Sequence, residues 1–286
     1  MPTKIIIPVL NWNIKHLFSL ALVALLVTSC SKTEFPTCHT YVHLSHTRTE
    51  ENPSMDAVVE SKDYSIYDAV LLGGDLASST SQDDATMDHI DSFFDFGSES
   101  TLWTLGNHDV HTPSRISQYT GRERYYAWHD HGVTFVVLDT QIGNSSITGN
   151  QLQFFESVVD TIQISHALIL MTHKLIWMYG NDDLESQIND VSNGILGDCD
   201  YCLNPNNFYE DLYIPLSEVH ERGVKVTCIA GDIGKKVSQF QYRDDNGIQF
   251  LASGIRHGEI GNLYLELCNW PTLRSLVWSF KAVEAL

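Results

Sequence analysis

The chain has 286 residues, and its 36 acidic residues outnumber its 17 basic ones, which gives a formal net charge of −19 at pH 7. A surface of this sign repels polyanions, so we expect no nucleic-acid partner that binds through neutralisation of its phosphates. The length suits one α/β domain with a sizeable core, although two small domains would also fit.

Residues 1–29 have the features of a secretory signal peptide. They contain two lysines and no acidic residue, and an apolar stretch covers residues 17–27. That stretch is shorter than the about 20 apolar residues that a membrane span needs, and small residues follow it. The sequence around Cys30 resembles a bacterial lipobox, which implies a lipid on Cys30 and a cell-envelope lipoprotein, periplasmic or surface-exposed, held to the membrane by that lipid alone. An uncleaved anchor helix is the alternative.

After this segment we expect a tether over residues 30–39 and one domain over residues 40–286. The first part of the domain alternates between strand-like and helix-like patterns. Strands are predicted over 40–44, 68–72 and 101–105, with helices over 55–62 and 83–96 between them. This βαβαβ order is typical of a parallel sheet.

The second part continues with further strands and helices. A hairpin is predicted over 125–128 and 133–139, a helix from 149 onward, a strand over 167–171, a helix over 209–222 and a strand over 224–230. Residues 177–207 are polar and are predicted to form a long loop. We expect substrate specificity to lie in this loop. Alternating patterns in 237–242, 248–252, 262–267 and 274–280 predict a final antiparallel set.

Polar side chains follow two neighbouring strands of the predicted sheet. Gly74-Asp75 comes after the apolar run at 69–72, and Gly106-Asn107-His108-Asp109 comes after the run at 102–105. Side chains at the carboxyl ends of neighbouring parallel strands point into one crevice. Asp75 and Asn107 can therefore meet on one metal ion.

These two loops resemble motifs of the calcineurin-like metallophosphoesterase family, whose fold holds two metal ions between two β-sheets. The resemblance covers residues 40 to about 267 and implies an α/β, two-sheet sandwich with a βαβαβ core flanked by helices. It implies that one metal is held by Asp75, Asn107, His173 and Asp232. Two carboxylates, an amide oxygen and an imidazole suit manganese, iron, magnesium or zinc.

The chain departs from the family at the other metal position. The family's Asp-x-His is replaced by His46-Thr47-Arg48, and its last histidine is replaced by Gly234. An arginine has no free lone pair for a metal, and Gly234 has no side chain. We therefore expect one divalent metal per chain, with Arg48 balancing transition-state charge in place of the lost ion. His46 would bind a phosphoryl oxygen or orient the attacking water.

The resemblance further implies that His108 protonates the leaving oxygen and that Asp109 holds the ring of His108. The expected function is an envelope-anchored phosphoesterase that hydrolyses a phosphomonoester or phosphodiester in a phosphorylated small molecule or envelope glycan. One alternative is an inactive relative in which Arg48 pairs with Asp75 and closes the pocket. A second is a non-catalytic protein that binds a phosphorylated or acidic glycan in its arginine-lined crevice. Another is a hydrolase of non-phosphate esters.

Two residues separate Cys199 from Cys202 in the sequence. Such a pair forms either a short disulfide clip or half of a zinc site. No second cysteine pair at zinc spacing accompanies them, which favours the clip. Further pairs among Cys38, Cys228 and Cys268 are compatible with an oxidising compartment.

Overall fold

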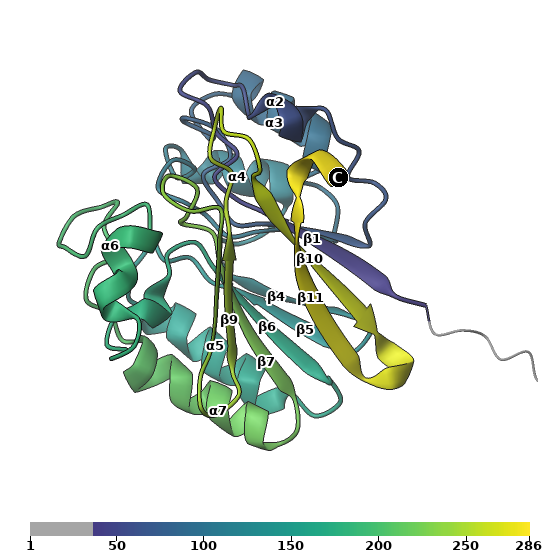
Figure 1. Ribbon diagram of the computed structural model, residues 1–286, viewed down its shortest axis with the longest axis vertical. Coiled ribbons are helices and arrows are strands. Elements are labelled where there is room, and N and C mark those ends of the chain that lie inside the picture. Colours follow the sequence, from purple (N-terminus) through teal and green to yellow (C-terminus); the bar gives the residue numbers. More distant parts are fainter. Residues whose placement is uncertain (1–36) are drawn as a thin grey trace, which may run out of the picture. The chain divides into compact units, whose positions relative to one another are not determined.

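Two mixed β-sheets face each other, and helices cover both outer faces (Figure 1). The computed structural model describes residues 37–286. The five-stranded sheet has the order β11 (Ser275–Ala282), β10 (Leu263–Trp270), β1 (His39–Leu44), β2 (Ala69–Leu72), β3 (Thr101–Trp103). The six-stranded sheet has the order β4 (Tyr126–Asp130), β5 (Val133–Val137), β6 (Ala167–Thr172), β7 (Lys225–Ala230), β9 (Gln249–Ser253), β8 (Gln239–Arg243). The α/β two-sheet sandwich predicted from the sequence is thus confirmed.

The helices form the two outer layers. The five-stranded sheet is covered by α2 (Ala57–Glu60), α3 (Asp84–Phe94) and α4 (Pro113–Thr120). The six-stranded sheet is covered by α5 (Gly149–Thr161) and α7 (Tyr213–Glu221), which Figure 1 shows side by side, and by the π-helical turn η3 (Phe208–Leu212). Short helical turns complete the chain: η1 (Ile176–Met178), η2 (Glu185–Gln187), α6 (Ile188–Val191), η4 (Pro271–Leu273) and η5 (Val283–Ala285).

Local sequence signals set the limits of α3. The Asp83 side chain accepts a hydrogen bond from the Thr86 backbone N–H at 2.8 Å, which caps the first turn. The helix ends at Asp95, whose φ of 50° lies in the left-handed region. Its buried side chains include Met87 and Ile90, spaced three residues apart, so one face packs on the sheet.

The space between the two sheets is filled by apolar side chains from both. Leu71 of β2, Phe135 of β5 and Ile229 of β7 belong to this central cluster, and each is fully buried. Strands β2 and β6 are buried on both faces, which explains why their sequences are continuous apolar runs. The buried strands give a rigid base for the loops at their carboxyl ends.

Three predicted elements differ from the structure. The helix expected over 55–62 is only the single turn α2, because Met55 pairs with Arg48 as an isolated bridge and is extended. The final strands do not form one antiparallel set: β9 pairs in parallel with β7, while the β10–β11 hairpin closes the other sheet. The polar segment 177–207 contains short helical turns and buried apolar residues, so it is an ordered part of the fold.

The folded unit begins earlier than the predicted tether allowed. His39 is the first residue of β1, and Cys38 forms a disulfide with Cys268 of β10. Residues 38–39 therefore belong to the fold. Cys30 and the expected signal segment over 1–29 lie outside the described residues. Over residues 37–286, no helix combines the length and apolar character that crossing a membrane requires.

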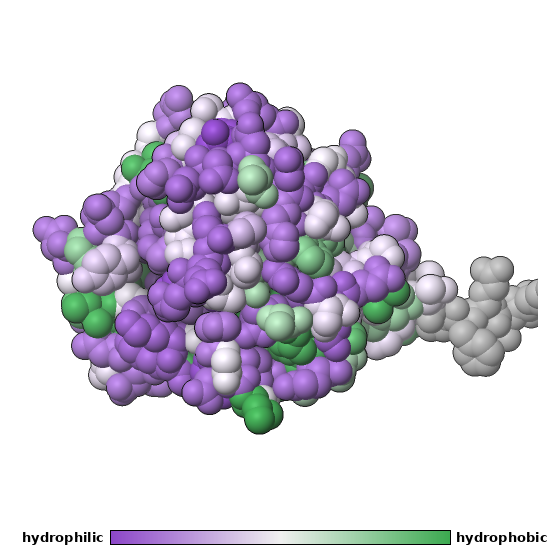
Figure 2. Space-filling view, turned by 90° about the horizontal axis from the view of Figure 1, so that it is seen from above, coloured by the Kyte–Doolittle hydropathy of each residue, from purple (hydrophilic) through white to green (hydrophobic). Residues whose placement is uncertain are grey.

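Hydrophilic side chains dominate the face of the molecule shown in Figure 2, and hydrophobic ones are scattered singly among them. Scattered exposed apolar residues are normal for a folded domain.

Candidate metal centre

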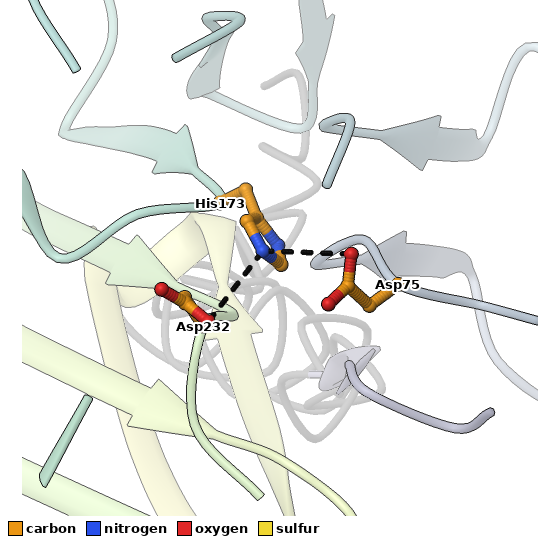
Figure 3. A group of neighbouring side chains, drawn as sticks. All are labelled: Asp75, His173 and Asp232. Carbon is orange, nitrogen blue, oxygen red and sulfur yellow. Dashed lines mark ion pairs between the residues drawn. The ribbon is translucent and has the colours of Figure 1, made fainter. Parts of the chain in front are cut away.

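Three buried ligand side chains converge where three strands end. Asp75 follows β2, His173 follows β6 and Asp232 follows β7, and Figure 3 shows their polar atoms turned toward one another. One ligand atom from each residue lies within 4.8 Å of the other two. All three side chains are almost fully buried, so two carboxylates and an imidazole lie close together away from solvent.

The ring of His173 is oriented as a metal ligand requires. Its Nδ1–H donates to the Gly73 carbonyl at 2.7 Å, which leaves Nε2 unprotonated in the neutral ring. Nε2 is buried without a hydrogen-bond partner, and it lies 3.7 Å from a carboxylate oxygen of Asp75 and 3.7 Å from one of Asp232. A buried lone pair without a partner is costly, and coordination of a cation would satisfy it.

The electrostatics of the group also favour a cation. Burial raises the pKa of the Asp232 carboxyl to about 6, and the nearby negative charge of Asp75 acts in the same direction, while His173 opposes it. Burial lowers the pKa of His173, but the two carboxylates outweigh it and raise that pKa above its ordinary value. The cluster therefore has excess negative charge, which a divalent ion would balance. These residues fit the divalent metal expected from the sequence.

The other predicted site residues, except Asp109, line one cavity of about 350 Å³ that also contains Asp75 and Asp232 in its wall. It is lined by His46, Arg48, Asp75, Asn107, His108, Asn193, Gly194, Tyr201, Asp232 and Lys235. The fourth predicted ligand, Asn107, is thus on the wall shared with Asp75 and Asp232. Only glycine fits at position 106, because a Cβ there would collide with the Asp75 carboxylate.

The predicted role of Asp109 is wrong. Its carboxylate, which is fully buried, accepts from the backbone N–H groups of Asp75 (2.7 Å), Leu76 (3.1 Å) and Gly106 (2.7 Å), and from the Thr80 hydroxyl (2.5 Å). Each oxygen of the Asp109 carboxylate accepts two hydrogen bonds, so this carboxylate does not hold the His108 ring. Asp109 instead fixes the backbone of the two ligand loops.

His108 is held by a backbone carbonyl. Its Nδ1–H donates to the Ser78 carbonyl at 2.7 Å, and its backbone N–H donates to Asp75 Oδ1 at 3.1 Å. This leaves Nε2 as the ring nitrogen available for proton transfer in the cavity that His108 lines.

His46 occupies the place that a side chain at position 234 would need. The Nδ1–H of His46 donates to the Ile255 carbonyl at 3.0 Å. A Cβ on Gly234 would lie 2.6 Å from that carbonyl oxygen and 2.8 Å from His46 Nδ1, and the φ of Gly234 is +120°. The two departures from the family pattern are therefore coupled sterically.

Arg48 lines the cavity without a carboxylate partner. No acidic side chain among residues 37–286 lies within 4.0 Å of its guanidinium nitrogens, so it is not paired with Asp75 as the inactive alternative required. Its Nε is buried and has no hydrogen-bond acceptor. The guanidinium is thus available for an anion.

Four residues that line the cavity were not predicted individually from the sequence: Asn193, Gly194, Tyr201 and Lys235. Lys235 directly follows Gly234, so its place next to an expected ligand loop was a usable signal. The other three lie in the segment 177–207, in which substrate specificity was expected, but no pattern within that segment distinguished them. Tyr201 lies between Cys199 and Cys202, which form a disulfide in the structure. Cys228 is a free, buried cysteine.

No family model and no curated protein sequence matches this chain. Among solved structures, the chain is similar to a dimetal phosphatase from Danio rerio, with a TM-score of 0.53, 12% identity, and coverage of 85% of this chain and 96% of that one. It is also similar to the phosphopantetheinyl hydrolase of Mycobacterium tuberculosis (TM-score 0.42, 14% identity, 78% and 92% covered). A third similar structure is the NAD nucleotidase of Haemophilus influenzae (0.41, 12%, 86% and 49%). The chain has the fold of the first of these, the metallophosphoesterase-like sandwich of two sheets.

Proposed function

We propose that the chain is a metal-dependent phosphoesterase that hydrolyses a phosphomonoester or phosphodiester with one metal ion and Arg48. The observation that carries this proposal is the buried group of Asp75, His173 and Asp232 beside a cavity that Arg48 and His108 also line. The substrate would be a phosphorylated small molecule or envelope glycan. We further propose that Cys30 anchors the protein in the cell envelope.

Arg48 provides the second positive charge of the site in this proposal. A planar guanidinium can donate to two phosphoryl oxygens at once, and it stays charged at any working pH. The absence of a protein acceptor for Nε is consistent with an anionic ligand. Because the donor is fixed before the reaction, it stabilises developing charge without reorganisation.

The protein's own residues account for the proton transfers. A water oxygen forms a bond to phosphorus while the bond to the leaving oxygen breaks. His46 orients that water by accepting a hydrogen bond from it at Nε2, since its Nδ1–H is donated to Ile255. His108, in its protonated form, gives the Nε2 proton to the leaving oxygen. The protons of the water stay on the product phosphate, which returns one of them to His108 and so restores its protonated form. A divalent ion held by Asp75, Asn107, His173 and Asp232 would supply Lewis-acid stabilisation of the phosphoryl oxygens.

Elemental analysis of the purified protein tests the metal content. After incubation with manganese, iron, magnesium or zinc and removal of the free ion, we expect one equivalent per chain. Asp232→Ala should lose it, because one of two carboxylate ligands is gone. Two equivalents would contradict the assignment of Arg48. No metal with any ion would favour a non-catalytic protein that binds a phosphorylated or acidic glycan.

The variant Arg48→Ala tests the role of the guanidinium. Loss of one preorganised donor typically costs about 10²–10³ in rate, so hydrolysis of a phosphoester should fall by at least that factor. The bound metal should remain, because Arg48 is not a ligand. Arg243→Ala is a matched control, since Arg243 is exposed and does not line the cavity. Full activity of Arg48→Ala would show that this mechanism is wrong.

A further inference from the structure

Tyr201, an exposed aromatic residue on the turn 199–202, lines the cavity. Tyr201 is 58% exposed, although it lines the same cavity as Asp75 and Asp232. The turn belongs to the segment around α6, which forms a lobe on the side of the molecule away from β10 and β11 (Figure 1). An exposed tyrosine on a loop is common, so what distinguishes this one is how the turn is held.

The turn is fixed by covalent and hydrogen bonds. Cys199 and Cys202 form a disulfide across it. The Asn204 side chain accepts from the Cys199 backbone N–H at 3.1 Å and donates to the Cys199 carbonyl at 3.1 Å. Gly194 packs so closely on the Tyr201 carbonyl that a Cβ at position 194 would collide with it. The phenol ring is therefore carried by a backbone with little freedom.

A buried lysine connects this turn to the metal group. Lys174 directly follows the ligand His173 and is fully buried. Its Nζ donates to the Asp200 carbonyl at 2.9 Å, and it has no carboxylate partner within 4.0 Å among residues 37–286. A buried ammonium group is costly unless its hydrogen bonds are satisfied. This contact ties the position of Tyr201 to the loop that carries a metal ligand.

The cavity thus has two chemically different parts. Arg48 and Lys235 have no ion-pair partner among the described residues, and the buried Nδ2 of Asn193 has no acceptor. These groups suit the oxygens of a phosphoryl group. The ring of Tyr201, carried by this fixed backbone, offers an apolar face on which a planar group can stack. A volume of about 350 Å³ holds a phosphoryl group together with one ring.

We propose that Tyr201 is a specificity-determining residue that selects phosphoesters whose leaving group contains a planar aromatic ring. This inference rests on the proposed phosphoesterase function and names the substrate class of the same site. The rigid turn lowers the entropy lost when the ring of the substrate binds. Tyr201 takes no part in the bond-breaking step, so its contribution lies in binding.

The test uses two esters that differ in planarity but hardly in leaving-group basicity: benzyl phosphate and cyclohexylmethyl phosphate. The metal-loaded wild-type protein should have the higher kcat/KM for the benzyl ester. Tyr201→Ala should lower kcat/KM for the benzyl ester about two- to twelvefold more than for the cyclohexylmethyl ester, the range expected for one aromatic pair, and mainly through KM. Tyr201→Phe should keep the preference, because the ring remains. Tyr201→Leu should lose it, although apolar bulk remains.

Binding of the non-hydrolysable analogues benzylphosphonate and cyclohexylmethylphosphonate, measured by calorimetry, separates this inference from the proposed function. Preferential binding of benzylphosphonate that Tyr201→Ala abolishes would support the inference even if neither ester were hydrolysed. Hydrolysis of both esters with equal losses in Tyr201→Ala would overturn the inference and leave the phosphoesterase proposal standing. The double variant Cys199→Ser, Cys202→Ser should weaken benzylphosphonate binding while Tyr201 is present. Unchanged binding would overturn the role of the rigid turn.

Discussion

The carboxylate of Asp109 joins the loops that follow β2 and β3. It accepts hydrogen bonds from backbone groups of Asp75, Leu76 and Gly106, and all of these are buried. Asparagine at this position would replace one accepting oxygen with an amide that cannot accept. With the amide turned toward Leu76 and Thr80, the Thr80 hydroxyl can accept from it, but the Leu76 backbone N–H faces a donor. A buried unsatisfied donor costs roughly 1–3 kcal/mol.

We therefore expect Asp109→Asn to lower the free energy of unfolding by about 1–3 kcal/mol and to weaken metal binding, because the loop that carries Asp75 loses one of its hydrogen bonds. Urea denaturation with and without metal measures both effects. Thr80→Ser is the matched control: it keeps the hydroxyl that donates to the Asp109 carboxylate and accepts from the Ala77 backbone N–H, so metal binding should be unchanged. If Asp109→Asn left the urea midpoint of unfolding unchanged but greatly reduced hydrolysis, Asp109 would instead have a role in catalysis.

Gly234 shows how one residue constrains another across the site. Its φ of +120° is unfavourable for any residue with a Cβ, and that Cβ would also meet His46 and the Ile255 carbonyl. Gly234→Ala should lower the free energy of unfolding by about 1–3 kcal/mol. In the His46→Ala background the loss should be smaller, because part of the collision is gone, and a double-mutant cycle from thermal unfolding measures the difference. Equal losses in both backgrounds would show that the two positions are independent.

The same contact limits any attempt to restore the family-like first metal position. His46→Asp and Arg48→His would supply two ligand types, but Gly234 leaves the set one ligand short. The positive φ at position 234 disfavours a histidine there even after the ring of His46 is removed.

At the scale of elements, β1 is secured at its start by a disulfide. Cys38 precedes β1 and is bonded to Cys268 of β10, 230 residues away in the sequence and with 5.6 Å between the two Cα atoms. β1 lies between β10 and β2, so its loss would divide the five-stranded sheet. The unfolded chain loses more conformational freedom when a long loop is closed than when a short one is closed.

Replacing Cys38 and Cys268 with serine should therefore lower the free energy of unfolding by roughly 2–4 kcal/mol. The matched control is Cys199→Ser with Cys202→Ser, which opens a loop with a sequence separation of only 3 and should cost less. Chemical denaturation with and without a reductant measures both, and reduced wild-type protein should resemble the quadruple serine variant. A larger loss of unfolding free energy in the Cys199→Ser, Cys202→Ser variant than in the Cys38→Ser, Cys268→Ser variant would contradict this prediction.

Elements with a strong local signal were predicted correctly, and pairing between distant elements was not. The apolar runs of β2, β6 and β7 were found because strands buried on both faces are continuous in the sequence. The resemblance to the metallophosphoesterase motifs singled out Asp75, His173 and Asp232, each of which follows such a run, and the structure brings these three together. Alternation in the last four strands showed which face is buried but not which sheet each strand joins, since register depends on tertiary partners. The function of Asp109 was missed for the same reason, because three of its four partners come from the loop after β2.

At the scale of the whole molecule, the large negative charge bears on how the protein could be held at a membrane. The formal charge of −19 opposes attraction to a negatively charged lipid surface, because such surfaces attract basic segments. Over residues 37–286, moreover, no helix is suited to span a membrane. The lipid that we propose on Cys30 would supply an attachment of another kind, since insertion of acyl chains contributes about 0.8 kcal/mol per buried CH₂ group.

If Cys30 carries the lipid, the wild-type protein should stay in the membrane fraction in about 1 M salt, where surface charges are screened within about 3 Å, and should be released by detergent. Cys30→Ser should appear in the soluble fraction. Cys228→Ala is a suitable control, because Cys228 is a free cysteine buried inside the fold and its replacement should leave fractionation unchanged. Mass spectrometry of the wild-type protein should find the lipid on Cys30 as the first residue of the mature chain. Membrane retention of Cys30→Ser with an intact N-terminus would point instead to an uncleaved anchor helix over residues 17–27, because an apolar segment that remains in the bilayer needs no lipid.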